Sequence, residues 1–315
     1  MDASDLAPVD RVEVTILMDN YLDVLMAGAE DVRRFALTRD WASRDKPLAE
    51  HGYSALITVY RDGAPSSILY DAGLTPEGIA RNLDVLDVRP ADLRAIVISH
   101  GHFDHHGGLE GLVRRFGRAN LPLIIHPDAW AQRRVLLPTG AEILLPPPSM
   151  NDLEREGLHV IEERGPTLLI DGAVLVSGQV ERVTEFERGM AVHQRRTDAG
   201  WVPDPLIPDD QNIIANVRGR GLVIVSACSH AGAVNVVLGA KRLTGQDLVA
   251  GFIGGLHLTG GLFEPIIEPT VRALAEAGVQ RIVPGHCSGW KAQYTIARDL
   301  PDAFVQSAVG TTLSF

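Results

Sequence analysis

The feature that most constrains this chain is a cluster of four potential metal ligands placed directly after an apolar strand. The strand is predicted over 95–99, and the ligands that follow are His100, His102, Asp104 and His105. A glycine-flanked loop behind a buried strand lets alternate side chains converge on one point. Three imidazoles and a carboxylate suit Zn²⁺, or Fe and Mn where oxygen donors are more numerous. A polar loop with surface histidines is the alternative, but it leaves the strand that leads into the cluster unexplained.

Three later strand ends carry histidines in similar surroundings. His230 follows a predicted strand over 221–226, and His286 ends a short strand over 281–283 as part of Pro-Gly-His. We predict that both bind metal. His257 also follows a strand and two glycines, so it is interpreted as a ligand, a proton donor or a substrate contact at the same site. A buried structural histidine is the alternative for His257.

Several other polar residues admit two interpretations. Asp71 precedes a glycine turn after a strand, and it either orients a ligand histidine through the free ring nitrogen or only forms the turn. Cys228 is either a thiolate ligand or a packed small residue, and the second is favoured because His230 can supply the metal bond. Two of the remaining histidines, His159 and His193, are interpreted as surface residues. Two others, His51 and His126, lie at strand ends and could line the cleft.

The rest of the chain alternates strand and helix patterns, which is typical of an α/β fold. Thr75 is the predicted N-cap of a helix that begins at Pro76 and extends to 86. Residues 138–210 are irregular and contain proline clusters, and part of this stretch is expected to form a lid or substrate-binding insertion within a single domain spanning 1–315. Further strands are predicted over 12–17, 54–60, 67–70, 121–125, 167–170, 173–177, 212–217 and 248–253, and further helices up to 116, over 233–244 and over 270–277.

Composition excludes several other classes of protein. Hydrophobic residues make up 45% and charged residues 22% of the 315, as in ordinary globular proteins. The formal charge of −11 disfavours nucleic acid as a partner, because a phosphate backbone needs compensating lysines and arginines. No apolar run approaches the roughly 20 residues of a membrane span, and the acidic N-terminus does not resemble a signal peptide. We therefore expect a cytoplasmic protein, with no membrane partner, whose Cys228 and Cys287 are reduced thiols.

The segment from His100 to His105 resembles the metallo-β-lactamase superfamily, whose hallmark is His-x-His-x-Asp-His. The resemblance implies a four-layer αβ/βα sandwich with two metals at the edge where the sheets meet. It implies that His100 and His102 bind one metal and that Asp104 and His105 bind the other. Asp71 matches the superfamily's upstream Asp-x-Gly element, and His286 matches its final ligand histidine.

The second half of the implied ligand set departs from the superfamily. In much of the superfamily, a strand like 221–226 ends in an aspartate that bridges the metals, but here Cys228-Ser229-His230 stands in that region. Asp209 and Asp210, just before the preceding strand, could supply the carboxylate, or they could form a solvated acidic turn. The bridging group is therefore left open among Cys228, Asp209, Asp210 and solvent.

Further motifs are similar to one branch of the superfamily, the proteins described as dihydropteroate-synthase-like or 7,8-dihydropterin-6-methyl-4-(β-D-ribofuranosyl)aminobenzene-5′-phosphate synthase-like. The motifs span nearly the whole chain and include Leu17-Met18-Asp19-Asn20, His51-Gly52-Tyr53-Ser54, Gly254-Gly255-Leu256-His257-Leu258 and Pro284-Gly285-His286-Cys287-Ser288-Gly289. The branch name suggests a small-molecule substrate that is phosphorylated or pterin-like.

A two-metal site implies hydrolytic chemistry, because two metals lower the pKa of bound water from 15.7 to roughly 7 and so supply a hydroxide nucleophile. We expect a metal-dependent hydrolase with two divalent ions, Zn²⁺ above Fe or Mn, acting on an ester, lactone, amide or phosphodiester. Asp104 is expected to orient the nucleophile, and His257 to donate a proton or hold the substrate. The alternatives are a pterin/aminobenzoate-ribosyl-phosphate synthase and a non-catalytic ligand-binding protein on the same fold. The sequence leaves the oligomeric state open.

Overall fold

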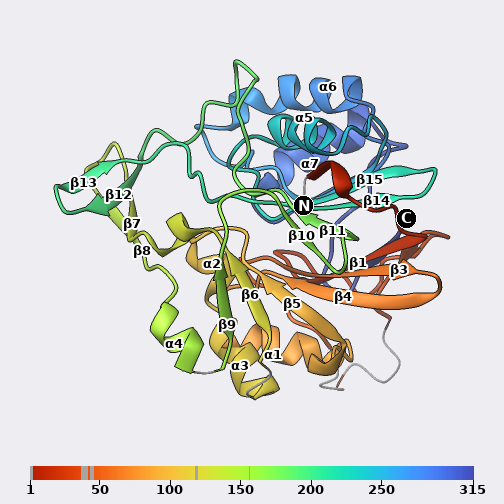
Figure 1. The fold of residues 1–315 in the computed structure, drawn as a ribbon. Coiled ribbons are helices and arrows are strands. Elements are labelled where there is room, and N and C mark those ends of the chain that lie inside the picture. Colours follow the sequence, from red (N-terminus) through yellow and green to blue (C-terminus); the bar gives the residue numbers. More distant parts are fainter. Residues whose placement is uncertain (1–2, 37–41, 43–45, 118–119, 156) are drawn as a thin grey trace.

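A computed structural model shows four layers, in which two β-sheets face each other and helices cover both outer faces (Figure 1). The structure describes residues 3–36, 42, 46–117, 120–155 and 157–315. This arrangement is the four-layer αβ/βα sandwich that the hallmark motif implies. Among the described residues, no helix is long and apolar enough to cross a membrane.

The first sheet has eight strands in the order β2-β18-β1-β3-β4-β5-β6-β9. An antiparallel half up to β4 continues into a parallel half, in which β4, β5, β6 and β9 run in the same direction. Helices α1 and α3 cover its outer face through a cluster of buried residues that includes Ile79, Leu83 and Leu112. The bounds are β1 Arg11–Met18, β2 Val32–Arg33, β3 Ser54–Arg61, β4 Ala64–Tyr70, β5 Leu93–Val97, β6 Pro122–Ile125, β9 His159–Glu162, β18 Thr312–Ser314, α1 Pro76–Val85, α2 Phe103–His106 and α3 Leu109–Phe116.

The second sheet has six strands in the order β10-β11-β14-β15-β16-β17, and β15, β16 and β17 are parallel. Helices α5, α6 and α7 pack on its outer face, and the two inner faces share a core that includes Val14, Ile57 and Val225. The bounds are β10 Thr167–Leu169, β11 Val174–Val176, β14 Ile213–Val217, β15 Gly221–Ser226, β16 Val249–Gly255, β17 Ile282–Gly285, α5 Ala233–Thr244, α6 Ile267–Glu276 and α7 Gly289–Asp299.

A third, four-stranded sheet in the order β13-β12-β7-β8 lies beside the sandwich (Figure 1). Its strands are short and come from two separate parts of the chain. They pair through β7 and β12, where His193 is opposite Val135. The bounds are β7 Arg133–Leu136, β8 Glu142–Leu145, β12 His193–Thr197 and β13 Gly200–Pro203, with α4 at Met150–Arg155.

The stretch 138–210, predicted to contain an insertion, is divided among all three sheets. β9 extends the first sheet and β10 and β11 begin the second, so only β8, β12 and β13 from this stretch stand apart from the sandwich. The small sheet also takes β7, which lies before residue 138. That part of this stretch acts as a lid stays a prediction.

Local sequence patterns account for most of the regular elements. Helix α1 begins at Pro76, and the side chain of Thr75 caps it by accepting a hydrogen bond from the Gly78 amide, as predicted. β15 and α5 have the predicted bounds. The strands of the small sheet were not predicted, because they are short and the polar and apolar residues of β7 and β12 do not alternate along the sequence.

Candidate metal centre

The candidate ligands follow the carboxyl ends of parallel strands in both large sheets. The hallmark loop follows β5, Cys228 and His230 follow β15, His257 follows β16, and His286 follows β17. Because the carboxyl ends of parallel strands meet at one edge of a sheet, these loops converge where the two sheets come together.

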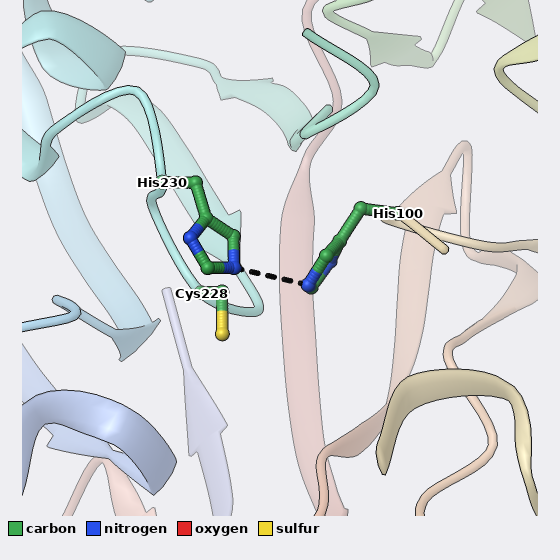
Figure 2. A group of neighbouring side chains, drawn as sticks. All are labelled: His100, Cys228 and His230. Carbon is green, nitrogen blue, oxygen red and sulfur yellow. Dashed lines mark hydrogen bonds between the residues drawn. The ribbon is translucent and has the colours of Figure 1, made fainter. Parts of the chain in front are cut away.

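The first group of ligand atoms consists of His100, Cys228 and His230, all buried, with their donor atoms within 4.8 Å of one another. Figure 2 shows the His100 and His230 rings facing each other across the space between the two sheets, with the Cys228 thiol beside His230. The two Nε2 atoms are 3.1 Å apart. Nδ1 of His100 lies 2.8 Å from Oγ of Ser99, so its Nε2 is the ring nitrogen that faces the group.

The second group consists of His105, Cys228 and His286, also buried and within the same distance of one another. Sγ of Cys228 lies 3.4 Å from Nε2 of His105. Nε2 of His286 is buried and has no hydrogen-bond partner among the described residues. Cys228 is thus the residue that the two groups share.

Asp104 lies at the edge of the second group. Its Oδ2 is 3.3 Å from Nε2 of His286, 3.7 Å from Nε2 of His105 and 3.6 Å from Nε2 of the exposed His51. His51, Asp104 and His286 form a further group of potential ligands. The Asp104 carboxylate therefore lies among three imidazoles, beside the second group of ligand atoms.

Asp71 orients the hallmark loop from the end of β4. Its Oδ2 lies 2.7 Å from Nδ1 of His105, and its carboxylate accepts hydrogen bonds from both the amide and the hydroxyl of Ser99, each at 2.7 Å. The contact with Nδ1 turns Nε2 of His105 toward Cys228. This is the placement expected of a carboxylate that orients a ligand histidine.

The electrostatics of the site suit neutral nitrogen donors and a bound cation. Burial lowers the pKa of His100, His102 and His230 well below the usual imidazole range, and neighbouring histidines lower it further. Burial alone would also lower the pKa of His105, but Asp104 and Asp71 outweigh burial and raise that pKa to about 9. The two carboxylates therefore attract positive charge to the place where the second group of donors meets.

The donor set fits divalent metal ions. Imidazole nitrogens and a thiol converge in both groups, and Nε2 of His286, which has no hydrogen-bond partner among the described residues, lies 3.3 Å from the Asp104 carboxylate, which could share a cation with it. His100, Cys228 and His230 would hold one ion, and His105, Cys228 and His286 would hold the other.

His102 lies beside these groups without joining one. Its ring centroid is 4.5 Å from that of His100 and 4.8 Å from that of His230, but no three-residue group among the described residues includes it. Its Nε2 lies 2.9 Å from Nε2 of His193. The sequence interpretation of His193 as a surface residue is therefore wrong, since His193 is fully buried. No sequence signal could have revealed it, because its neighbours on β12 are polar and half-exposed.

His257 lies beside the first group. Its ring centroid is 4.1 Å from that of His230, and its Nδ1 is buried without a hydrogen-bond partner in the described part of the chain. It also forms a fourth potential ligand group with Cys228 and Cys287, whose sulfur atoms are 3.2 Å apart. The geometry places His257 where a ligand, proton donor or substrate contact would lie.

The two aspartates suggested as bridging groups contact the backbone of the ligand loops without joining a ligand group among the described residues. Arg133 holds the carboxylate of Asp209, with Nη1 2.9 Å from Oδ2, and Asp210 accepts a hydrogen bond of 3.3 Å from the amide of Ala231. Both are buried, so they are not the solvated acidic turn considered as their alternative.

A pocket of about 190 Å³ opens beside His230 and His257. Nearly half of its lining residues are apolar, and Glu187 and Arg188 bring charge to it. The apolar and aromatic side chains in the lining are Phe186, Leu256, Leu258, Leu262, Phe263 and Ile266.

Comparisons with known proteins agree with the fold. Residues 52–241 match the family model of the metallo-beta-lactamase superfamily. The chain is 30% identical over 294 residues to the 7,8-dihydropterin-6-methyl-4-(beta-D-ribofuranosyl)-aminobenzene-5′-phosphate synthase of Methanocaldococcus jannaschii, covering 91% of this chain and 97% of that protein. An uncharacterized protein of the same organism is 31% identical over 249 residues, which cover 78% of this chain and 87% of the relative.

Among solved structures, the chain resembles Tm1679, described as a metal-dependent hydrolase of the beta-lactamase superfamily. The TM-score is 0.72 at 21% identity, and the match covers 96% of this chain and 98% of the other. At that identity the similarity concerns the fold.

Proposed function

The chain belongs to the metallo-β-lactamase superfamily, and from this premise we propose that it is a metal-dependent hydrolase of a small-molecule ester, lactone, amide or phosphodiester. The observation that carries the proposal is the pair of ligand groups, one on each side of Cys228, that draw donors from both large sheets. A donor set of imidazoles and one thiol favours Zn²⁺, with two ions per chain.

Divalent metals bound there would supply Lewis acidity and lower the pKa of water to roughly 7. The chain's own part is to hold the donors in place and to manage protons. Asp71 keeps Nε2 of His105 directed at the centre, and Asp104 presents a carboxylate oxygen that can accept a hydrogen bond from a nucleophilic water. His257, whose Nδ1 is buried without a partner among the described residues, would donate a proton to the leaving group or hold the substrate.

The apolar pocket beside His230 and His257 would take the non-reacting part of the substrate. Its lining of leucine and phenylalanine side chains suits a flat or aliphatic group, and Arg188 offers a positive charge for an anionic one. A substrate with an apolar body and a phosphate or carboxylate fits this pocket better than a fully polar one.

The test is turnover by protein loaded with Zn²⁺, Mn²⁺ or Fe²⁺ against panels of esters, lactones, amides and phosphodiesters. We expect activity that chelation removes and metal restores. His230→Ala should abolish it, whereas His159→Ala, at an exposed position on β9, should not. Loaded protein without turnover on any panel would contradict the proposal, and tight ligand binding without turnover would indicate a non-catalytic binding protein.

A second candidate is a synthase, favoured by one specific observation. The relative that is 30% identical over nearly the full length of both chains is named a 7,8-dihydropterin-6-methyl-4-(beta-D-ribofuranosyl)-aminobenzene-5′-phosphate synthase. On this alternative, the same centre would activate a phosphorylated leaving group on a dihydropterin, and an arylamine would take the place of water. Incubation with a phosphorylated 6-hydroxymethyl-7,8-dihydropterin, with and without 4-(β-D-ribofuranosyl)aminobenzene 5′-phosphate, separates condensation from hydrolysis by product mass.

A further inference from the structure

The small sheet sends one buried side chain to the hallmark loop. His193 begins β12, is fully buried, and places its Nε2 2.9 Å from Nε2 of His102. The two ring centroids are 5.0 Å apart. A strand outside the two core sheets therefore contacts one of the four hallmark residues directly.

The hydrogen bonds of His193 determine which nitrogen of His102 carries the proton. Nδ1 of His193 lies 3.1 Å from the backbone oxygen of Asp204, and a carbonyl oxygen can only accept, so Nδ1 of His193 carries the hydrogen. A neutral imidazole has one N–H, so Nε2 of His193 is an acceptor. The hydrogen between the rings must then belong to Nε2 of His102, which leaves Nδ1 of His102 with its lone pair free.

The same sheet also holds the backbone next to His102. The amide of Gly101 donates to Oδ2 of Asp209 at 2.9 Å, and Arg133 on β7 donates to that oxygen from Nη1 at 2.9 Å. Nε of Arg133 donates to Oδ2 of Asp204 at 3.1 Å. All three side chains are buried. One network thus positions the backbone beside His102 while His193 orients its ring.

We propose that His193 is a positioning residue of the metal centre, which accepts the Nε2 hydrogen of His102 and so reserves Nδ1 of His102 for the metal. The inference rests on the metal centre of the proposed function and assigns a role in that centre to the small sheet. Neither ring nitrogen of His102 joins a ligand group among the described residues, and the proposal assigns to Nδ1 the metal bond that the hallmark motif implies.

The test compares metal affinity in His193→Ala and His193→Gln with that of the wild type, by competition with a chromogenic chelator. Loss of a hydrogen-bond partner to a ligand histidine typically costs about 10–100-fold in metal affinity, so we expect a loss of that size in His193→Ala. The amide oxygen of Gln can accept the same hydrogen, so His193→Gln should recover affinity to within about 3-fold of wild type.

Gln194→Ala is the matched control, because Gln194 lies on the same strand and bonds Arg134 rather than the hallmark loop. It should leave metal affinity unchanged. An unchanged affinity in His193→Ala would overturn the proposal. A loss of metal affinity in both His193 variants, together with a changed Co²⁺ absorption spectrum, would also overturn the proposal. These two results would make His193 itself a ligand.

The proposal also has a check that needs no substitution. Long-range ¹H–¹⁵N spectra of Zn²⁺-loaded wild-type protein labelled with ¹⁵N-histidine report the tautomer of each ring. The Nε2–H form is expected for His102, and an Nδ1–H form would overturn the proposal. If the wild-type protein binds no metal, the proposed function itself fails. If the wild type and the His193 variants bind metal with equal affinity, only the role of His193 fails.

Discussion

Sγ of Cys228 lies 3.4 Å from Nε2 of His105, and the same sulfur completes the group formed by His100 and His230 on the other side. One thiol therefore stands between the two halves of the candidate centre. Its strand, β15, ends at the place where much of the superfamily carries a bridging aspartate. This position makes Cys228 a candidate shared ligand, and the sequence interpretation of a packed, inert cysteine stays its alternative.

Replacement of Cys228 should reduce the number of metal ions bound. We expect Cys228→Ala to weaken both sites, by more than the roughly 10–100-fold that loss of an outer hydrogen bond costs, because each site loses a direct donor. Cys228→Asp should retain metal, since a carboxylate can also bridge. Elemental analysis after desalting measures the metal content. Thr244→Ser, at a buried position at the end of α5 outside the ligand groups, is the control, and equal metal content in Cys228→Ala and wild type would contradict the shared role.

Replacement of Asp71 should weaken metal binding without removing a ligand. In Asp71→Asn the amide can still accept from Ser99, but it loses the charge that faces Nδ1 of His105 at 2.7 Å. We expect metal affinity to fall about 10–100-fold, measured by chelator competition. Asp87→Asn is a suitable control because Asp87 shares the positive φ, 53° against 60°, and is exposed. Equal affinities in the two variants would reject an orienting role.

Replacement of Arg133 should destabilise the fold. Its guanidinium is fully buried between Asp204 and Asp209, so Arg133→Met leaves two carboxylates without their cation. Removing one partner of a buried ion pair costs about 3–5 kcal/mol. Urea unfolding of metal-free protein measures the loss of unfolding free energy. Arg134→Met, at the more exposed neighbouring position, should lower the unfolding free energy by well under half as much. Similar losses of unfolding free energy in both variants would show that the buried network adds little stability.

Asp210 should make stability fall as pH rises. Burial raises its pKa from 3.8 to about 7, so between these values the unfolded chain has lost a proton that the folded chain keeps. The unfolding free energy that Asp210 contributes is therefore present at low pH and is lost as pH rises through this interval. Asp210→Asn removes the effect, because an amide does not titrate in this range. It replaces a buried carboxylate whose Oδ1 has no hydrogen-bond partner among the described residues.

The difference in unfolding free energy between Asp210→Asn and wild type should accordingly grow between about pH 4 and pH 7, to at most about 4 kcal/mol. Urea titrations of metal-free protein at several pH values measure it. Asp247→Asn, at an exposed position between α5 and β16, should give a difference that does not change with pH. A pH-independent difference for Asp210→Asn would refute the prediction.

His257→Ala should separate proton transfer from metal binding. If His257 donates a proton, turnover falls about 10²–10⁴-fold while metal content stays at the wild-type value. If it is a ligand with Cys228 and Cys287, metal content falls in parallel with turnover. If it only contacts substrate, KM rises and kcat changes little. Elemental analysis beside steady-state kinetics distinguishes these outcomes.

Local patterns were sufficient to predict much of the sandwich. β5 is a short apolar run, and α1 has a threonine cap and a proline at its first position, so each carries its own signal within about ten residues. The small sheet carries no such signal. β7 and β12 pair only because the chain between them returns, and polar and apolar residues do not alternate along the sequence of either strand.

The sequence by itself determined the kinds of candidate ligand and their order along the chain, because His100, His105, His230 and His286 each follow a strand whose end is visible in the local hydrophobic pattern. Only the tertiary structure decided which atoms meet. It placed Cys228 between the two groups, Asp209 on Arg133 and His193 on His102. These contacts join residues that are tens of residues apart, and they depend on how two sheets and an added sheet pack, which periodicity within one segment does not encode.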